Sequence, residues 1–285
     1  MLTSLAMIAF ATNSLLCRLA LKQTAIDPAT FTTIRIFSGA VALWLIIKMR
    51  RISLGKSGNW PSALALFAYA AGFSFAYVEL SAGTGALLLF VAVQATMILW
   101  GLCKGERLDA IQITGLVVAM TGLAILVFPG LSAPPLIGSI LMLGAGVAWG
   151  IYSLRGKGQQ NPASVTAGNF IRAVPFSLVV WMLFLQRAHI DFAGIGYAVI
   201  SGAIASGLGY VIWYSALPSL KAASAATVQL SVPVLAATGG ILLLGEPITL
   251  RYVLASVAVL GGIALVVVTL HSQNQTASRA DESRS

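Results

Sequence analysis

Residues 83–127 read GTGALLLFVAVQATMILWGLCKGERLDAIQITGLVVAMTGLAILV, and residues 224–268 read SAATVQLSVPVLAATGGILLLGEPITLRYVLASVAVLGGIALVVV. Each stretch holds an apolar run of helix length, a Gly-Glu pair and a second apolar run that contains glycine. A shift of 140 residues lays Gly105-Glu106 on Gly245-Glu246, and Gly122 on Gly262. The chain therefore carries two copies of one unit, and this duplication decides the fold.

The duplication continues toward the N-terminus with a shift of 137 residues, as a few inserted residues would cause. It carries Arg18 onto Arg155 and Ile34-Arg35 onto Ile171-Arg172. The same shift pairs Trp44 with Trp181, Tyr77 with Tyr214, and Leu80 with Leu217. We predict a first half at residues 1–128, a second half at 129–270, and a polar, disordered tail at 271–285.

The composition is that of a membrane protein. The chain is 58% hydrophobic and 9% charged, with a mean hydropathy of +0.92, whereas soluble domains have about 25% charged residues. Ten segments are long and apolar enough to span a bilayer as helices: 2–21, 31–49, 60–80, 83–103, 108–128, 135–154, 163–185, 192–217, 221–244 and 250–270. They are uniformly apolar and do not alternate as barrel strands do, so we predict an all-α membrane protein.

Five predicted spans in each half is an odd number, so the second half must be inverted in the membrane relative to the first. Two inverted five-helix repeats are the construction of secondary transporters, with the substrate site between the repeats near the bilayer midplane. The sequence therefore predicts a transporter.

The net charge of +9 is explained by topology and not by nucleic-acid binding. With both termini in the cytoplasm, eleven of the 17 Lys and Arg residues fall in inner loops or the tail. The outer loops contain three, Lys22, Arg187 and Arg251. This bias satisfies the positive-inside rule and predicts a multi-pass protein of the bacterial inner membrane.

Sequence signatures of enzymes and ATPases are missing. The chain has no GxxxxGK[ST], HExxH or GxSxG motif and no His-Cys cluster, so we expect no enzyme activity, no metal and no cofactor. Cys17 and Cys103 are expected near opposite membrane surfaces, so we predict no disulfide.

The quoted stretches, each a small-residue helix followed by Gly-Glu and a glycine-rich helix, resemble the EamA-type, ten-helix branch of the drug/metabolite transporter superfamily over residues 2–270. GTGALLLFVAVQ, preceded by Tyr77-x-x-Leu80, is similar to the YddG-like amino-acid exporters. The resemblance implies export of amino acids, aromatic or otherwise hydrophobic. The mid-helix proline of this pattern, Pro233, has Gln94 as its counterpart in the first half, so the halves differ at membrane depth.

Polar and aromatic side chains within the spans are the candidates for substrate binding. Our candidate substrate-binding residues are Asn13, Tyr77, Glu79, Gln94, Trp149, Trp213 and Gln229, and Pro233 is the candidate hinge. Amides would orient polar groups, Trp149 and Tyr77 would hold an apolar side chain, and Glu79 would meet an ammonium group. Helix packing, or an interfacial position for Glu79, is the alternative role.

The remaining charged groups near the spans are expected to be structural. We predict that Arg18 and Arg35 lie in the outer half, where arginines extend to the interface, and that Arg172 lies deeper. Glu106 and Glu246 would pair with Arg107 and Arg251 or cap the following helices.

We therefore expect a secondary transporter that works by alternating access on a small-molecule substrate, most simply an amino acid. The lack of a carboxylate placed centrally by the sequence favours facilitated diffusion. The alternatives are another cargo, such as a drug, purine or nucleotide sugar, or a membrane scaffold that transports nothing. The sequence leaves open whether the protein is a monomer or a dimer.

Overall fold

The computed structural model describes residues 2–51, 57–105, 108–128, 130, 133–159, 161–217 and 228–282. These residues form helices, and no strand occurs among them. In chain order the helices are α1 (Leu2–Gln23), α2 (Pro28–Met49), α3 (Trp60–Tyr77), α4 (Ala82–Cys103), α5 (Ala110–Val127), α6 (Leu136–Gly156), α7 (Pro162–Leu183), the short η1 (Leu185–Arg187), α8 (Phe192–Ile200), η2 (Ser201–Leu208), α9 (Gly209–Ala216), α11 (Ser231–Leu244) and α12 (Leu250–Glu282).

The first eight predicted spans match helical runs within a few residues, whereas α11 begins ten residues after the predicted start of its span and α12 ends twelve residues beyond the predicted end. Seven helical runs are long and apolar enough to cross a membrane, and one of them is the continuous run Phe192–Ala216 formed by α8, η2 and α9. Together with α3 and the two helices α11 and α12, whose apolar stretches are shorter, they make ten helical runs in the described part of the chain. The all-helical prediction is therefore confirmed.

Polar caps set where several helices begin. Asp27 accepts hydrogen bonds from the backbone N–H groups of Ala29 and Thr30 at the start of α2. Comparable side-chain caps are Asn59 before α3, Ser81 before α4, Asp109 before α5 and Asp191 before α8. Each cap satisfies an N–H group that has no partner within the helix, and so fixes where that helix begins.

The expectation of a disordered tail was wrong for most of its length. Helix α12 continues through residues 271–282 to Glu282. The sequence HSQNQTASRADE contains neither glycine nor proline, so nothing in it stops a helix that has already formed.

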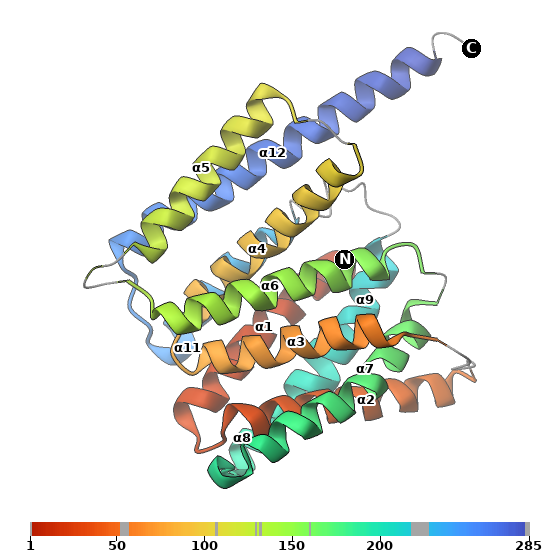
Figure 1. Ribbon diagram of the computed structural model, residues 1–285, viewed down its shortest axis with the longest axis vertical. Helices are drawn as coiled ribbons and strands as arrows, with labels where there is room; N and C mark the ends of the chain where they lie inside the picture. The colour runs from red at the N-terminus through yellow and green to blue at the C-terminus, as the bar shows by residue number, and fades with distance from the viewer. Residues whose placement is uncertain are drawn as a thin grey trace.

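The long helices lie side by side as a bundle (Figure 1). At one edge α5 packs against α12, and at the opposite edge α2 packs against α7. Glycines permit the first contact, because a Cβ atom on Gly115 or Gly262 would overlap the backbone of the facing helix. Helices α1, α3, α4, α6 and the α8–α9 run lie between these edges and surround the centre of the bundle.

The bundle has two ends, which we name by one residue each. The Glu246 end carries the α3–α4 and α11–α12 turns, and the Asn59 end carries the start of α3 and the end of α6.

Near Pro233 the chain is helical at residues 228–229, turns at Leu230, and begins α11 at Ser231. Pro233 has no N–H to donate to a preceding carbonyl, which accounts for the interruption.

Candidate functional site

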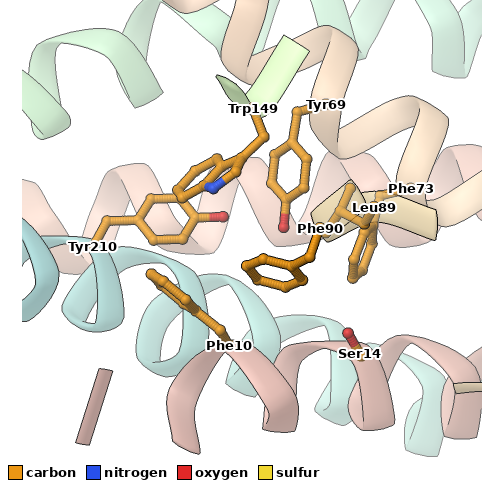
Figure 2. Close-up of a pocket in the computed structure, with 8 residues that line it drawn as sticks. All are labelled: Phe10, Ser14, Tyr69, Phe73, Leu89, Phe90, Trp149 and Tyr210. Carbon is orange, nitrogen blue, oxygen red and sulfur yellow. The ribbon is translucent and has the colours of Figure 1, made fainter. Parts of the chain in front are cut away.

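A small cavity lies at the centre of the bundle and is walled by aromatic rings (Figure 2). It is lined by Phe10 and Ser14 of α1, Tyr69 and Phe73 of α3, Leu89 and Phe90 of α4, Trp149 of α6, and Tyr210 of α9. The space open to the centre of a water molecule is only about 10 Å³, and a water needs about 10–15 Å³ by this measure. The structure therefore shows a closed centre.

Trp149 is the hub of the aromatic wall. Its ring centroid lies 4.6 Å from that of Tyr210, 4.9 Å from Tyr69 and 5.8 Å from Phe10. Only 3% of Trp149 is exposed. The contact with Phe10 is edge-to-face and the contacts with Tyr69 and Tyr210 are tilted, all at the distances usual for aromatic pairs, so the packed rings close the cavity.

A buried cation stands directly behind this wall. Arg35 of α2 is 1% exposed, and its Nη2 donates to the Tyr69 hydroxyl at 3.0 Å and to the Tyr210 hydroxyl at 3.3 Å. Its Cζ lies 4.9 Å from the centroid of the Phe73 ring and 5.2 Å from that of Tyr69. Arg35 thus touches three side chains that line the cavity.

Asn13 joins the same polar network from α1. Its Nδ2 donates to the Tyr69 hydroxyl at 3.1 Å, and its Oδ1 accepts from Ser201 at 2.6 Å. The Tyr69 oxygen therefore accepts from both Asn13 and Arg35, which occupies its two lone pairs. Figure 2 shows the Tyr69 and Tyr210 hydroxyls pointing toward one another in the middle of the ring cluster.

The π-helix η2 supplies two serines of this network. Ser201 donates to Asn13, and Ser206 Oγ accepts from Arg35 Nε at 3.1 Å. In an α-helix residues five apart point about 140° away from each other, whereas the wider π turn brings positions five apart toward one face. Gly202 lies against the carbonyl of Arg35, where a Cβ atom would overlap it, so α2 and η2 approach closely.

Arg35 has no carboxylate partner among the described residues. Seven carboxylates occur in that part of the chain: Asp27, Glu79, Asp109, Asp191 and Glu246, together with Asp281 and Glu282 at the end of α12. The ion pair found in it joins Glu246 to Arg18. Arg35 Nη1 is buried without a hydrogen-bond partner in the same residues. The network at the centre therefore carries a net positive charge and an unused donor.

The Glu246 end of the bundle is held closed by Arg18. Its Nε lies 3.1 Å from Glu246 Oε1, and its Nη1 donates to the carbonyls of Tyr77 and Val78. Glu246 Oε2 also accepts from the backbone N–H of Ala82 at 2.8 Å. One side chain of α1 thus joins the end of α3, the start of α4 and the α11–α12 turn.

The Asn59 end is held by Arg155 and Arg172. Arg155 donates to Ser62 Oγ at 2.9 Å and to Asn59 Oδ1 at 3.1 Å. Arg172 Nη1 donates to the carbonyls of Ser57 and Gly168 at 2.8 and 2.9 Å. Both arginines fasten the start of α3 or the segment before it to α6 and α7.

A larger cavity of about 190 Å³ lies at the Glu246 end. Its walls include Glu79, Ser81, Thr84, Glu246, Thr249 and Tyr252. It contains Glu79, which is exposed and separate from the central cavity.

The structure gathers some of the candidate residues and separates others. Trp149 lines the central cavity, Asn13 binds its Tyr69, and Trp213 packs on its Phe10 at a centroid distance of 5.9 Å. Glu79 lies in the other cavity.

The other candidates are buried but do not line the central cavity. Tyr77 packs on Phe73 with ring centroids 4.7 Å apart and donates to the Ala82 carbonyl. Gln94 lies four residues beyond Phe90 on α4, and its Nε2 has no hydrogen-bond partner in the described residues. Gln229 is buried just before the turn at Leu230.

Three expectations about charged residues need correction. Arg35 does not extend to an interface, because the hydroxyls of α3 and α9 and the serine of η2 hold it at the centre. Arg172 is the one that reaches toward an end. Glu246 pairs with Arg18, while Arg251 donates to the Phe128 carbonyl. Glu106 and Arg107 lie outside the described residues.

Sequence reasoning missed Arg35, Tyr69, Tyr210 and the serines of η2. Arg35 and Tyr69 were visible as polar groups within predicted spans, which was the available signal. Their convergence depends on how α2, α3 and η2 pack together, and the helical pattern alone does not show it.

Comparison with known proteins agrees with this architecture. The model of the EamA-like transporter family matches residues 1–128 and again residues 136–268. An uncharacterized protein of Pseudomonas aeruginosa is 56% identical over 268 residues, which are 94% of this chain and 93% of that protein. A crystal structure with 18% sequence identity has the same fold, with a TM-score of 0.66 over 93% of this chain and 99% of that one.

A relative with a named activity is more distant. The threonine/homoserine exporter RhtA of Salmonella typhimurium is 29% identical over 252 residues, which are 86% of this chain and 83% of the exporter. The family match covers nearly the whole chain, and the helices are those of a multi-pass membrane protein. This chain therefore belongs to the EamA-like transporter family; it is a transporter and not an enzyme.

Proposed function

We propose that this transporter exports amino acids with apolar or aromatic side chains across the bacterial inner membrane by alternating access. The observation that carries the proposal is the central cavity, which combines an aromatic wall with a hydrogen-bonding network at one side. An amino acid has these two parts, a polar backbone portion and a side chain. RhtA, an exporter of amino acids by its name, supports the substrate class.

Alternating access requires that the cavity open to each side in turn. We propose that the two halves are inverted repeats, which the double match of one family model supports. Arg18 near the end of α1 and Arg155 near the end of α6 are related by the sequence shift, and each holds one end of the bundle. With the termini in the cytoplasm, as the positive-inside rule favours, the Glu246 end faces outward. Release of Arg18 would open that end, and release of Arg155 would open the other.

The test is counterflow in proteoliposomes with labelled L-phenylalanine, L-leucine and L-threonine, and with uridine and a nucleotide sugar as other cargo classes. We expect saturable exchange of at least one amino acid and none of the nucleotide sugar. Exchange of uridine or of the nucleotide sugar, without exchange of any amino acid, would contradict the proposal that the substrate is an amino acid.

Substitution of two tryptophans tests whether the substrate binds in the central cavity. Trp149→Ala should lower exchange about ten-fold through loss of aromatic contacts. Trp44→Ala is the matched control, because Trp44 is 41% exposed on the outside of α2. Equal effects of the two changes would place the substrate elsewhere. The candidate roles of Gln94, Gln229, Tyr77 and Glu79, and of Pro233 as a hinge, remain proposals for the same assay.

A further inference from the structure

We propose that Arg35 is the charge that selects for a carboxylate on the substrate, acting through the hydroxyl groups of Tyr69 and Tyr210. This inference rests on the proposed function in one respect, that the solute passes through the central cavity. It goes further by naming the group that the site recognises, a carboxylate, and the residue that selects for this group, Arg35.

The first step is the charge itself. A guanidinium remains protonated in proteins and can only donate hydrogen bonds. Arg35 is 1% exposed, and its three partners, Ser206, Tyr69 and Tyr210, are neutral hydroxyl groups. A buried ion without a counter-ion is costly, and ionisable groups inside membrane proteins mark substrate or ion sites by default.

The second step is the unused hydrogen-bonding capacity. Arg35 Nε and Nη2 have partners, whereas Nη1 has none among the described residues. The Tyr69 oxygen already accepts two N–H bonds, and the Tyr69 hydroxyl also shares a hydrogen bond with the Tyr210 hydroxyl. The hydroxyl pair therefore has one O–H left to donate. This O–H and Nη1 both call for an acceptor, and a carboxylate is an acceptor with negative charge.

The third step is position. Arg35 is not itself a lining residue, but Nη2 holds the oxygens of two lining tyrosines. The closed cavity admits about one water molecule, so a solute could enter only when the rings separate. A carboxylate in the opened cavity would accept a hydrogen bond from this hydroxyl pair, with the guanidinium charge directly behind it. Phe10, Phe90 and Trp149 would contact the apolar remainder of the solute. The opened site would therefore fit an apolar carboxylate or amino acid and disfavour an amine that lacks the carboxylate.

The experiment compares solutes that differ only in their charged groups. Counterflow of the amino acid that exchanges fastest is measured against unlabelled competitors in two series. One series is L-phenylalanine, 3-phenylpropanoate and phenethylamine. The other is L-threonine, 3-hydroxybutanoate and 1-amino-2-propanol. We expect the amino acid or acid of at least one series to compete ten-fold or more better than its amine.

Variants then assign the preference to Arg35. Arg35→Met should abolish the preference for the acid over the amine, and Arg35→Lys should restore part of it. Arg172→Met is the matched control, with the same residue type at the corresponding position of the second half and partners that are backbone carbonyls. Size-exclusion profiles and thermal unfolding confirm that each variant is folded.

Several results would overturn the inference. One is an amine that competes as well as its amino acid in the wild type, and another is a preference that Arg35→Met leaves intact. If Arg35→Met does not fold, the inference is tested by comparing how strongly the acid and the amine compete in the wild type and in Arg35→Lys. The same preference for the acid in both proteins would overturn the inference, and a weaker preference in Arg35→Lys would support it.

If no solute exchanges at all, the proposed function fails. The inference about Arg35 is then tested separately, by measuring whether solutes bind to the purified protein. Thermal stabilisation of the purified protein by 3-phenylpropanoate but not by phenethylamine would then support it. Equal or absent stabilisation would overturn it.

Discussion

Arg35 and Arg172 occupy corresponding positions in the two halves of the sequence but have different environments. Arg35 lies at the centre, fully buried, and donates to hydroxyl groups of three other helices. Arg172 is half-buried and donates to two backbone carbonyls near the Asn59 end. In the first half this residue type therefore places a charge at the centre of the bundle, and in the second half it fastens the segment before α3 to α7.

The arginines seventeen residues earlier in each half, Arg18 and Arg155, differ in a second way. Arg18 binds a carboxylate, Glu246, whereas Arg155 binds an amide oxygen and a hydroxyl. The halves thus share where their arginines stand in the sequence but not what neutralises them. The charged groups of the two copies have therefore diverged, and the arginine that is both fully buried and without a carboxylate partner in the described part of the chain, Arg35, stands beside the cavity.

The largest effect should come from breaking the ion pair at the Glu246 end. Arg18→Gln leaves a 6% exposed carboxylate side chain without its cation, which should cost about 3–5 kcal/mol of stability. Arg155→Gln removes hydrogen bonds to neutral groups and should cost about 1–3 kcal/mol. Thermal unfolding of both purified variants measures the difference, and equal losses would show that the two ends are held with equal strength.

The next effect is on transport. Arg35→Gln should lower exchange about 100-fold, equivalent to about 2.7 kcal/mol, whereas Arg172→Gln should stay within about three-fold of the wild type. The empty Arg35→Gln protein should unfold at the same temperature as the wild type or higher, because it no longer buries an unpaired charge. A large loss of stability in Arg35→Gln, with transport falling only in proportion to folded protein, would make Arg35 a structural residue.

Removal of the Tyr69 or Tyr210 hydroxyl tests whether the charge of Arg35 acts on the substrate through these groups. Tyr210→Phe and Tyr69→Phe should each lower exchange about three- to ten-fold, the loss of one hydrogen bond near a charge. Tyr197→Phe is a control, since Tyr197 of α8 is partly buried but is not among the residues that line the cavity. Wild-type rates in both Tyr69→Phe and Tyr210→Phe would mean that substrate does not meet these hydroxyls.

The smallest effect concerns Gln94. Its Nε2 is buried without a partner in the described residues, so Gln94→Leu should change stability by no more than about 0.5 kcal/mol or raise it. If Gln94 meets substrate in another conformation, exchange should fall while unfolding is unchanged. Loss of several kcal/mol in thermal unfolding would instead reveal an essential packing role.

The sequence predicted the helices well because apolar runs and polar caps act locally. Asp27, Asn59 and Asp109 stand directly before helices that begin where an apolar run begins. Asn13 and Trp149, chosen because they are polar and aromatic residues within predicted spans, lie in the central network and in the cavity wall.

The sequence did not predict the position of Arg35, because distance from a helix end is a poor measure of where a long side chain finishes. The π-helix was also missed, since helical periodicity assumes 3.6 residues per turn throughout. Ser201 and Ser206 would point in different directions on that assumption, so their joint contribution to one network could not be deduced.

The tightness of the central cavity also bears on what the empty protein lets through. A hydrated ion needs a continuous column of water to cross a membrane, and the space at the centre admits about one water molecule. The packed rings around Trp149 therefore leave no room for such a column at the central cavity. A carrier closed in this way does not conduct hydrated ions through its centre while it waits for substrate.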